Sequence, residues 1–308
     1  MKFTLFAQPP FNFLSVVNSH GWRQLAPFSY DEDTQTLFYI LRLATGRVIE
    51  LKMREAPKGV QVETEKLNKT ERNEMKDKVT WMLGLDMDFS PFYAASRGEP
   101  RLAHAKKLAH GRVLRSPTLF EDVIKTILTT NTLWAATKNM TLKLVNELGT
   151  ALPLSSASGT IVRGAVGKVE GPVKKSFPTP EAIAASSPQF IQEKIRVGYR
   201  APAIHQLAVR LTSGEFDLEA LKTSELPTLE LRKELLKING VGPYAAANLL
   251  LILGRSDFIP IDSWALKLVS HEWYRGKPIT PKEVEKRFDK WGEFKGLAFW
   301  FWDWNYKG

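Results

Sequence analysis

The sequence predicts a mainly α-helical protein with a small α+β domain at its N-terminus. Two patterns along the 308 residues support this fold class. Within residues 1–64, apolar and polar side chains alternate, as they do in strands that bury one face. From residue 65 onward, apolar side chains recur every three or four positions, which is the spacing of helices. We therefore expect an antiparallel-sheet domain over residues 1–64 and a helical domain over residues 65–308.

Alternation is clearest in three segments of the N-terminal domain. The first runs through Leu37, Tyr39 and Leu41, and the other two span residues 48–53 and 60–63. Turn-forming Asp and Gly residues stand between these segments, as expected for a small antiparallel sheet.

The helical pattern begins with a charged stretch near Glu65 and ends at Gly84. Two amphipathic helices are expected next, over residues 119–128 and 134–148, and Gly149 stops the second. Each shows apolar residues on one helical face, so both should pack against a core.

A segment unsuited to regular core structure follows at residues 155–177, where four glycines mix with Arg and Lys. We expect a loop there, either a disordered insertion or a basic flap that touches phosphate. Beyond it, Thr179-Pro180 and Ser187-Pro188 each place an N-cap residue before a proline, so helices should begin at both. The chain is then expected to be helical almost to its end.

Composition narrows the classes of function. Lys and Arg number 43 against 33 Asp and Glu, a net charge of +10, which favours a polyanionic partner. The chain has no cysteine, which excludes disulfides, thiolate zinc sites and iron–sulfur clusters. The five histidines are scattered without metal-ligand spacing. The start of the chain leads into Pro9-Pro10, and no apolar run approaches about 18 residues, so we expect a soluble, unprocessed protein without a membrane segment.

Residues 235–252 form the most informative segment. An apolar helix ends, the turn Gly240-Val241-Gly242 follows, and Pro243 opens a second helix rich in alanine. Two glycines around one apolar residue allow a sharp turn in which the Val241 side chain packs inward. The second helix would then present unpaired N-terminal amides, a site suited to a phosphate group. A plain pair of antiparallel helices is the alternative interpretation.

A short extended stretch downstream, Pro260-Ile261-Asp262, delivers an aspartate to the start of another helix. Taken alone, Asp262 is equally well explained as an N-cap. Together with the Gly240-Val241-Gly242 turn, however, it resembles the signature of the helix-hairpin-helix DNA glycosylase superfamily (HhH-GPD). The resemblance covers roughly residues 80–300 and implies a helical core of two lobes with a cleft between them. In that superfamily the aspartate is catalytic.

Two further segments, residues 104–149 and 198–201, are similar to the corresponding segments of the 8-oxoguanine glycosylases. The resemblance implies that Asn131 fills the space left by a flipped base, and that Tyr199 and Arg200 wedge into the duplex. Each also has a simpler explanation, because Asn131 could cap a helix, Tyr199 could be buried and Arg200 could lie on the surface. The N-terminal sheet fits the small domain of the 8-oxoguanine and 3-methyladenine II branches.

The resemblance also implies how DNA is held and cut. Backbone amides around Gly240, Gly242, Tyr244 and Ala245 would bind phosphates of double-stranded DNA that contains a damaged base. Asp262 would stabilise positive charge developing on the sugar and activate water. No cofactor is expected to be required. A structural Na⁺ or K⁺ is implied at the hairpin, held by three carbonyls, those of Leu236, Ile238 and Val241.

Position 244 distinguishes reaction types within the superfamily. Bifunctional members carry a lysine there that forms a Schiff base, whereas this chain has Tyr244, which implies hydrolysis without a lyase step. The 8-oxoguanine enzymes carry a glutamine that reads the oxidised purine. This chain lacks that glutamine, and its place falls near Phe299. Six of the nine tryptophans lie between Trp264 and Trp304. Most should be core, but Tyr244, Trp264 and Phe299 are candidates for an aromatic base pocket.

Such a pocket favours electron-poor or cationic bases, so alkylated bases are the first expectation. The alternatives are a glycosylase for oxidised or deaminated purines and a protein that binds lesions or abasic sites without catalysis. We expect a monomer that acts where DNA is, in the cytoplasm or nucleoid of a prokaryote or the nucleus of a eukaryote.

Overall fold

A five-stranded antiparallel sheet and a larger set of helices make up the computed structural model, which describes residues 1–153 and 173–304. The sheet order is β1-β5-β4-β3-β2, and every neighbouring pair is antiparallel. The strands are β1 (Lys2–Phe6), β2 (Phe28–Asp31), β3 (Thr36–Arg42), β4 (Val48–Ala56) and β5 (Gly59–Glu63).

The helices in residues 1–153 are α1 (Phe13–Val17), η1 (Gly21–Gln24), α2 (Lys69–Leu83), α3 (Ser90–Ala95), η2 (Pro100–Leu102), α4 (Leu119–Thr129) and α5 (Trp134–Leu148). Those in residues 173–304 are α6 (Pro180–Ala184), α7 (Pro188–Phe190), η4 (Ile191–Ile195), η5 (Gly198–Arg200), α8 (Ala201–Thr212), η6 (Glu219–Thr223), α9 (Thr228–Leu236), α10 (Pro243–Ile252), α11 (Ser263–Tyr274), α12 (Pro281–Phe288), η7 (Asp289–Phe294) and α13 (Lys295–Trp300).

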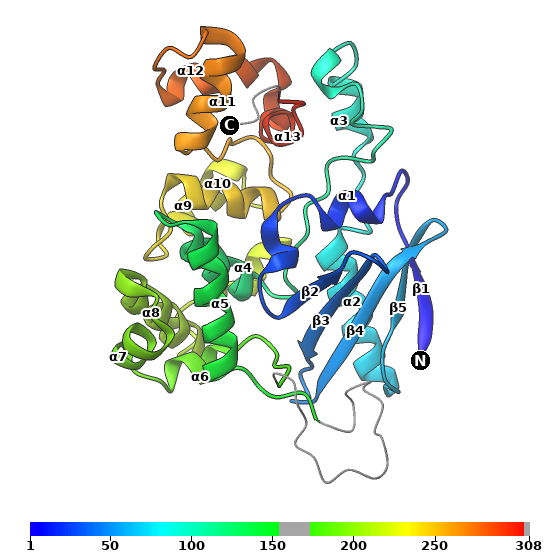
Figure 1. Ribbon diagram of the computed structural model, residues 1–308, viewed down its shortest axis with the longest axis vertical. Coiled ribbons are helices and arrows are strands. Elements are labelled where there is room, and N and C mark those ends of the chain that lie inside the picture. The colour runs from blue at the N-terminus through cyan, green and yellow to red at the C-terminus, as the bar shows by residue number, and fades with distance from the viewer. Residues whose placement is uncertain (154–172, 305–308) are drawn as a thin grey trace.

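The predicted fold class is confirmed. Strands form where the side chains alternate, and Leu37, Leu41 and Leu51 are buried on the sheet. Helix α2 ends at Gly84 in a left-handed conformation, which glycine adopts without steric cost. In Figure 1 this helix lies behind the sheet, and the remaining helices stack beside and above it.

The helix starts predicted from N-cap residues are also present. The Thr179 hydroxyl accepts a hydrogen bond from Ala182 N at 3.3 Å, and that of Ser187 accepts one from Phe190 N at 3.0 Å. Each satisfies an amide that the first helical turn leaves without a partner. Helix α7 spans three residues and continues directly into η4.

A single buried apolar cluster connects the sheet with the helices. It includes Met53 of β4, Val79 of α2 and Ile124 of α4. The domain boundary between residues 64 and 65 therefore stays a prediction. No helix within the described ranges is long and apolar enough to cross a membrane.

Most of the basic loop expected at 155–177 lies outside the described residues. At its described end, the Lys174 ammonium pairs with the carboxylate of Glu50, and that of Lys175 donates to the carbonyl of Asn146. These two cations therefore contact the body of the protein.

Candidate functional site

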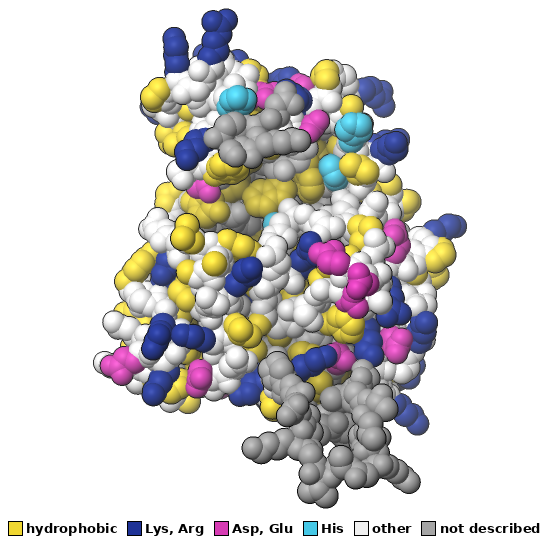
Figure 2. Space-filling view, viewed as in Figure 1, with side chains coloured by type: hydrophobic (Ala, Val, Ile, Leu, Met, Phe, Trp, Pro, Cys, Tyr) yellow, Lys and Arg dark blue, Asp and Glu magenta, His cyan; other side chains and the backbone are white. Residues whose placement is uncertain are grey.

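Two adjoining cavities meet at Asp262. The larger, here called the outer groove, has a volume of about 810 Å³, and the smaller, here called the inner pocket, about 300 Å³. Asp262, Tyr244, Thr129 and Thr132 line both. On the face drawn in Figure 2, hydrophobic side chains gather in a hollow beneath the C-terminal helices. An open groove that adjoins a smaller pocket suits an extended ligand that inserts one group.

The outer groove is formed by loops and helix ends. Its walls come from the end of α4 and the loop after it, the segment around η5, the α9–α10 turn and the start of α11. The lining residues are Ile127, Thr129, Thr130, Asn131, Thr132, Tyr199, Arg200, Ala203, Gly240, Val241, Gly242, Pro243, Tyr244, Ala245, Ile261, Asp262 and Ser263.

Asp262 occupies the N-cap of α11. Its Oδ1 accepts a hydrogen bond from Ala265 N at 2.8 Å, which fixes the side chain at the helix start. The residue is nevertheless exposed and lines both cavities. The N-cap interpretation and a place in the cleft are thus compatible, because the cap orients the carboxylate that the cavities share.

The α9–α10 turn has the predicted hairpin geometry. Gly240 has a φ of +84°, a conformation that side chains rarely adopt, and Val241 packs inward with 6% exposure. Val241 N donates to Ile238 O at 3.0 Å and closes the turn. Gly242 is the N-cap of α10 and offers no side-chain cap. The first amides of α10 therefore lack partners within the helix and lie at the outer groove.

Tyr244 stands one residue inside α10 and faces both cavities. Burial, and after it the negative charge of Asp262, raises the pKa of the Tyr244 phenol. The phenol therefore stays protonated and neutral near pH 7. One turn further along, the Asn248 amide donates to Tyr244 O at 3.1 Å and also lines the inner pocket.

Three tryptophans from distant parts of the sequence line the inner pocket, together with His20. Each indole N–H has an acceptor, so the three rings are held in fixed orientations. The acceptors are Asp122 Oδ1 at 2.7 Å for Trp22, Gln24 Oε1 at 3.0 Å for Trp134 and Ser19 O at 2.9 Å for Trp300.

Gly21 lies between His20 and Trp22 in the sequence, and its backbone packs against the Trp134 ring. A Cβ built on it would come within 2.2 Å of Cζ2 of Trp134, closer than atoms can approach. The absence of a side chain at Gly21 therefore allows the Trp134 ring to lie against the backbone.

His20 is neutral in this setting. Burial lowers its pKa to about 4, and its Nε2 lies 2.6 Å from the carbonyl of Leu114. Because a carbonyl only accepts, Nε2 carries the proton. Trp22 N donates to Nδ1 at 3.4 Å, which agrees with this tautomer.

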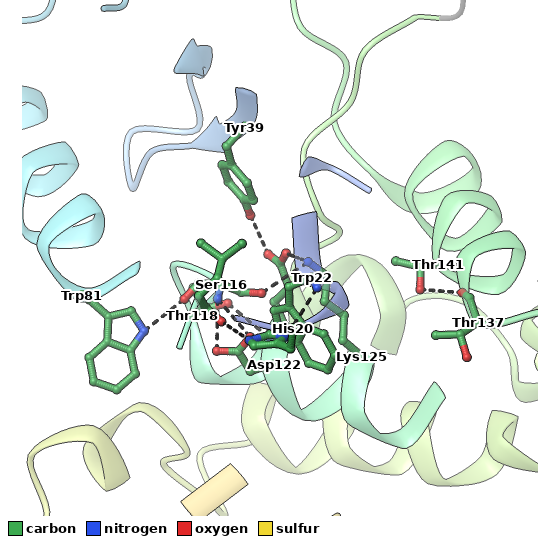
Figure 3. Close-up of polar contacts among 12 residues, drawn as sticks. His20, Trp22, Tyr39, Trp81, Ser116, Thr118, Asp122, Lys125, Thr137 and Thr141 are labelled. Carbon is green, nitrogen blue, oxygen red and sulfur yellow. Dashed lines mark hydrogen bonds and ion pairs between the residues drawn. The ribbon is translucent and has the colours of Figure 1, made fainter. Parts of the chain in front are cut away.

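A buried polar cluster supports this wall of the pocket from behind (Figure 3). Asp122 accepts hydrogen bonds from the Trp22 indole and from Ser116 N at 2.9 Å, and burial raises its pKa to about 6. One helical turn away, the Lys125 ammonium pairs with Glu121 at 2.6 Å. The cluster thus connects η1, which forms the pocket wall, to helix α4.

Tyr39 of β3 extends the same cluster into the sheet. Its hydroxyl donates to Glu121 Oε2 at 2.6 Å, and both side chains are buried. The N-terminal sheet is therefore fixed to α4 by hydrogen bonds as well as by apolar contacts.

Asn131 and Tyr199, for which the resemblance implied roles beside a flipped base, both line the outer groove. Asn131 has a φ of +47°, and its Nδ2 donates to Tyr199 Oη at 3.5 Å. Tyr199 is 66% exposed rather than buried. Hydrogen bonds, chiefly with Thr130, lower the pKa of its phenol. Leu133, two residues after Asn131, is 80% exposed.

Arg200 differs from its predicted role as a wedge. It is only 7% exposed, and its guanidinium donates to the carbonyls of Ile127, Val197 and Thr130. The Ile127 carbonyl also accepts from Thr130 N at 3.2 Å and from Thr130 Oγ1 at 2.8 Å, so the guanidinium adds charge-assisted hydrogen bonds at the end of α4. The side chain therefore lies within the groove wall rather than projecting into the groove.

Trp264 and Phe299 also differ from the predicted base pocket, since neither lines the outer groove or the inner pocket. Trp264 is 45% exposed, whereas Phe299 is buried. The Phe299 ring packs 5.6 Å from Phe288 and 5.4 Å from Trp304, centroid to centroid. Most C-terminal tryptophans are core, as expected, and Trp300 is the one that reaches the pocket.

Sequence comparison identifies the group of proteins to which this site belongs. The profile of the HhH-GPD superfamily of base excision DNA repair proteins matches residues 124–294. No protein in a curated collection matches the chain.

Solved structures share the whole fold at low sequence identity. A structure of MBOgg1 in complex with a low-affinity DNA ligand is 24% identical, covers 97% of this chain and 93% of its own, and has a TM-score of 0.73. The 3-methyladenine DNA glycosylase from Archaeoglobus fulgidus is 19% identical, with 97% of each chain covered and a TM-score of 0.71. The apo 8-oxoguanine glycosylase/lyase of Clostridium acetobutylicum is 20% identical over 94% of this chain and 91% of its own, with a TM-score of 0.69.

These structures show the fold, and the profile shows the family. The matched segment contains the hairpin, Asp262 and the loop that bears Asn131. Because it spans more than half of the chain, the protein belongs to the HhH-GPD superfamily of base excision DNA repair proteins and is a DNA glycosylase of that pathway.

Proposed function

We propose that the protein is a monofunctional DNA glycosylase that flips a damaged, alkylated base out of duplex DNA and hydrolyses its N-glycosidic bond with Asp262. The observation that carries this proposal is the position of Asp262 where the outer groove meets the inner pocket. With the duplex along the groove and the base in the pocket, the C1′ atom lies at that junction. A volume of about 300 Å³ is within the range of small-molecule pockets.

The chemistry follows from a carboxylate beside that carbon. As the C1′–N bond breaks, the base leaves with the bonding electrons and positive charge develops on the sugar. The Asp262 carboxylate stabilises that charge and orients or deprotonates the water whose oxygen bonds to C1′. The hydrogen bond from Ala265 N holds the carboxylate in place without neutralising it.

The α9–α10 hairpin would bind the backbone of the DNA strand. Amides from Gly240 to Ala245 lie at the groove, where the N-terminus of α10 favours a phosphate. Carbonyl oxygens suit a hard monovalent cation, and we propose that Leu236, Ile238 and Val241 hold Na⁺ or K⁺ there. The Ile238 carbonyl already accepts one hydrogen bond from Val241 N and retains a second lone pair. Such an ion would add positive charge near the phosphate.

Tyr244 supports hydrolysis without a lyase step. A Schiff base needs an amine at C1′, and the side chain that α10 presents to both cavities is a phenol. Borohydride is therefore expected to trap no covalent adduct between wild-type protein and lesion DNA. Tyr244→Lys places an amine at this position and should produce a trappable adduct. A strong adduct with the wild type would contradict the proposal.

The walls of the inner pocket support an alkylated base. Three indoles and a neutral His20 line the pocket, and electron-rich rings attract the positive charge of an alkylated purine. One observation favours the alternative, an oxidised or deaminated purine. Asn248 lines the same pocket, and a carboxamide can both donate to and accept from a neutral base edge.

A panel of duplexes tests the proposal. Each carries one lesion, namely 3-methyladenine, 7-methylguanine, hypoxanthine, uracil or 8-oxoguanine, and released base is measured under single-turnover conditions. The expected result is fastest release of the two methylated purines. Preferential release of hypoxanthine or 8-oxoguanine would support the alternative. Tight binding without release of any base would indicate a lesion-binding protein that lacks catalysis.

A further inference from the structure

Arg200 is a buried cation in the wall of a groove that otherwise exposes few charges. Among the residues lining the outer groove, the charged side chains are Arg200 and Asp262. The Arg200 guanidinium points into the protein, where Nε donates to Ile127 O and Nη1 to Val197 O, both at 3.2 Å. Its Nη2 donates to Thr130 O.

These contacts join the two segments that bear Asn131 and Tyr199. Ile127 and Thr130 belong to the last turn of α4 and its C-cap, directly before Asn131 takes up its left-handed backbone conformation. Positive charge at a helix C-terminus is favourable, because it donates charge-assisted hydrogen bonds to the last carbonyls and opposes the negative end of the helix dipole.

The same guanidinium also contacts the Tyr199 ring. Its carbon Cζ lies 4.5 Å from the ring centroid, a cation–π distance. Tyr199 Oη in turn accepts from Asn131 Nδ2 at 3.5 Å. Arg200 therefore touches the backbone before one of these groove residues and the side chain of the other.

We propose that Arg200 is a positioning residue, which holds Asn131 and Tyr199 together to fill the space vacated by a flipped base and contacts neither phosphate nor the opposite base. This inference rests on the proposed function.

The salt dependence of DNA binding separates a positioning role from direct contact. Each phosphate neutralised by a side chain contributes about 0.9 to the slope of log affinity against log salt concentration. Binding is measured on a duplex with a tetrahydrofuran abasic analogue, which does not depend on base release. We expect Arg200→Gln to leave the slope unchanged. A decrease of about 0.9 would overturn the proposal.

Arg196 provides the matched control. It lies four residues earlier on the same segment and is exposed. Arg196→Gln shows how the loss of an accessible cation from this segment affects binding. Base flipping is the second measurement, and it is followed from the fluorescence of a 2-aminopurine beside the lesion. The two variants are expected to differ in this measurement. We expect Arg200→Gln to lower the flipped population about tenfold, consistent with losing charge-assisted hydrogen bonds, and Arg196→Gln to leave it unchanged.

Double variants keep the test valid if Arg200→Gln is unstable. Arg200→Lys retains the charge but not the planar fork that reaches three carbonyls, so it should also reduce flipping. In an Asn131→Ala/Tyr199→Ala background, adding Arg200→Lys should cost nothing more, because the groups that Arg200 positions are gone. An additional loss in that background would show that Arg200 acts on DNA directly. If wild-type protein binds and flips but releases no base, the proposed function fails while this inference stands.

Discussion

The inner pocket and the outer groove share Asp262, yet the pocket and the Asn131–Tyr199 pair of the groove are built in opposite ways. In the pocket, every lining indole N–H is bonded, and Trp22 is fixed by a buried carboxylate. At the groove, Asn131 has a positive φ and Tyr199 is 66% exposed. The polar groups of the pocket wall are therefore bonded within the protein, whereas the pair at the groove leaves much of the Tyr199 ring exposed to solvent.

This difference fits a division of labour in base excision. A preformed pocket selects a base by shape and electronic character, since rigid rings cannot adapt to many ligands. Under the proposed function, exposed side chains at the groove would stabilise the opened duplex, which costs a few kcal/mol to create. Changes in the pocket should thus alter stability and selectivity, and changes at the groove should alter flipping.

Asp122→Ala should produce the largest effect on the pocket side. It leaves the indole N–H of Trp22 and the N–H of Ser116 buried without an acceptor, at about 1–3 kcal/mol each. We expect a loss of about 2–5 kcal/mol in the free energy of unfolding, measured by urea denaturation. Asp122→Asn keeps one acceptor oxygen and should lose roughly half as much. Equal stability of wild type and Asp122→Ala would show that the cluster does not hold the wall.

Gly21→Ala should narrow the inner pocket and leave the outer groove unchanged. The added Cβ would displace the Trp134 ring, and overpacking of this kind costs about 1–3 kcal/mol of folding free energy. Base release should fall by up to about a hundredfold, because the displaced ring no longer positions the base. A duplex with an abasic analogue inserts no base, so its affinity should stay the same. If both base release and abasic-site binding fall together, Gly21 supports the whole fold rather than the pocket.

Tyr199→Ala tests the groove side. Removing the exposed ring should lower the flipped population about tenfold, within the energy that one stacking side chain contributes, and leave the unfolding temperature nearly unchanged. Tyr199→Phe retains the ring and loses only the hydroxyl that accepts from Asn131, so a smaller decrease is expected. Should Tyr199→Ala instead destabilise the protein strongly, the groove residue would be structural.

The pH dependence of stability of the wild type should be small, because the contributions of two buried groups oppose each other. The pKa of His20 is lowered to about 4, so between pH 6.5 and 4 the unfolded chain binds a proton that the folded chain does not. Stability falls with acid over this range. The pKa of Asp122 is raised to about 6, so between pH 6 and 4 the folded chain binds the extra proton, and stability rises with acid. The two contributions oppose each other in the wild type.

Variants separate the two contributions. Asp122→Asn should lose stability more steeply than the wild type as the pH falls from 6.5 to 4. His20→Gln should gain stability relative to the wild type over the same interval. Thermal unfolding across this pH series measures both, and slopes of the same sign in the two variants would contradict the assignment.

The sequence predicts the hairpin and Asp262 because their signals are local. Gly240, Val241 and Gly242 encode a turn within three residues, and Asp262 follows on the same stretch of chain. The pocket wall has no such signal. His20 and Trp22 reach the pocket through contacts with residues about a hundred positions away, such as Asp122, and only the folded chain brings them together.

Arg200, Trp264 and Phe299 show the limits of reasoning from residue type. An arginine beside an exposed tyrosine suggests DNA contact, but hydrogen bonds to the carbonyls of Ile127 and Thr130 at the end of α4 hold its side chain inside. Aromatic residues near the C-terminus suggest a pocket, but Phe299 packs against Phe288 in the core. One pocket residue could have been found from the sequence, because Trp134 lies close to the predicted site residue Asn131 and lines the pocket.

Asp262 is proposed to stabilise the charge that develops on the sugar where the outer groove meets the inner pocket. Asp262→Asn retains an acceptor for Ala265 N, so α11 and the hairpin should be preserved. We predict that this variant binds lesion duplex within about twofold of the wild type, while single-turnover base release falls by about 10²–10⁴-fold. Base release at the wild-type rate would contradict the account.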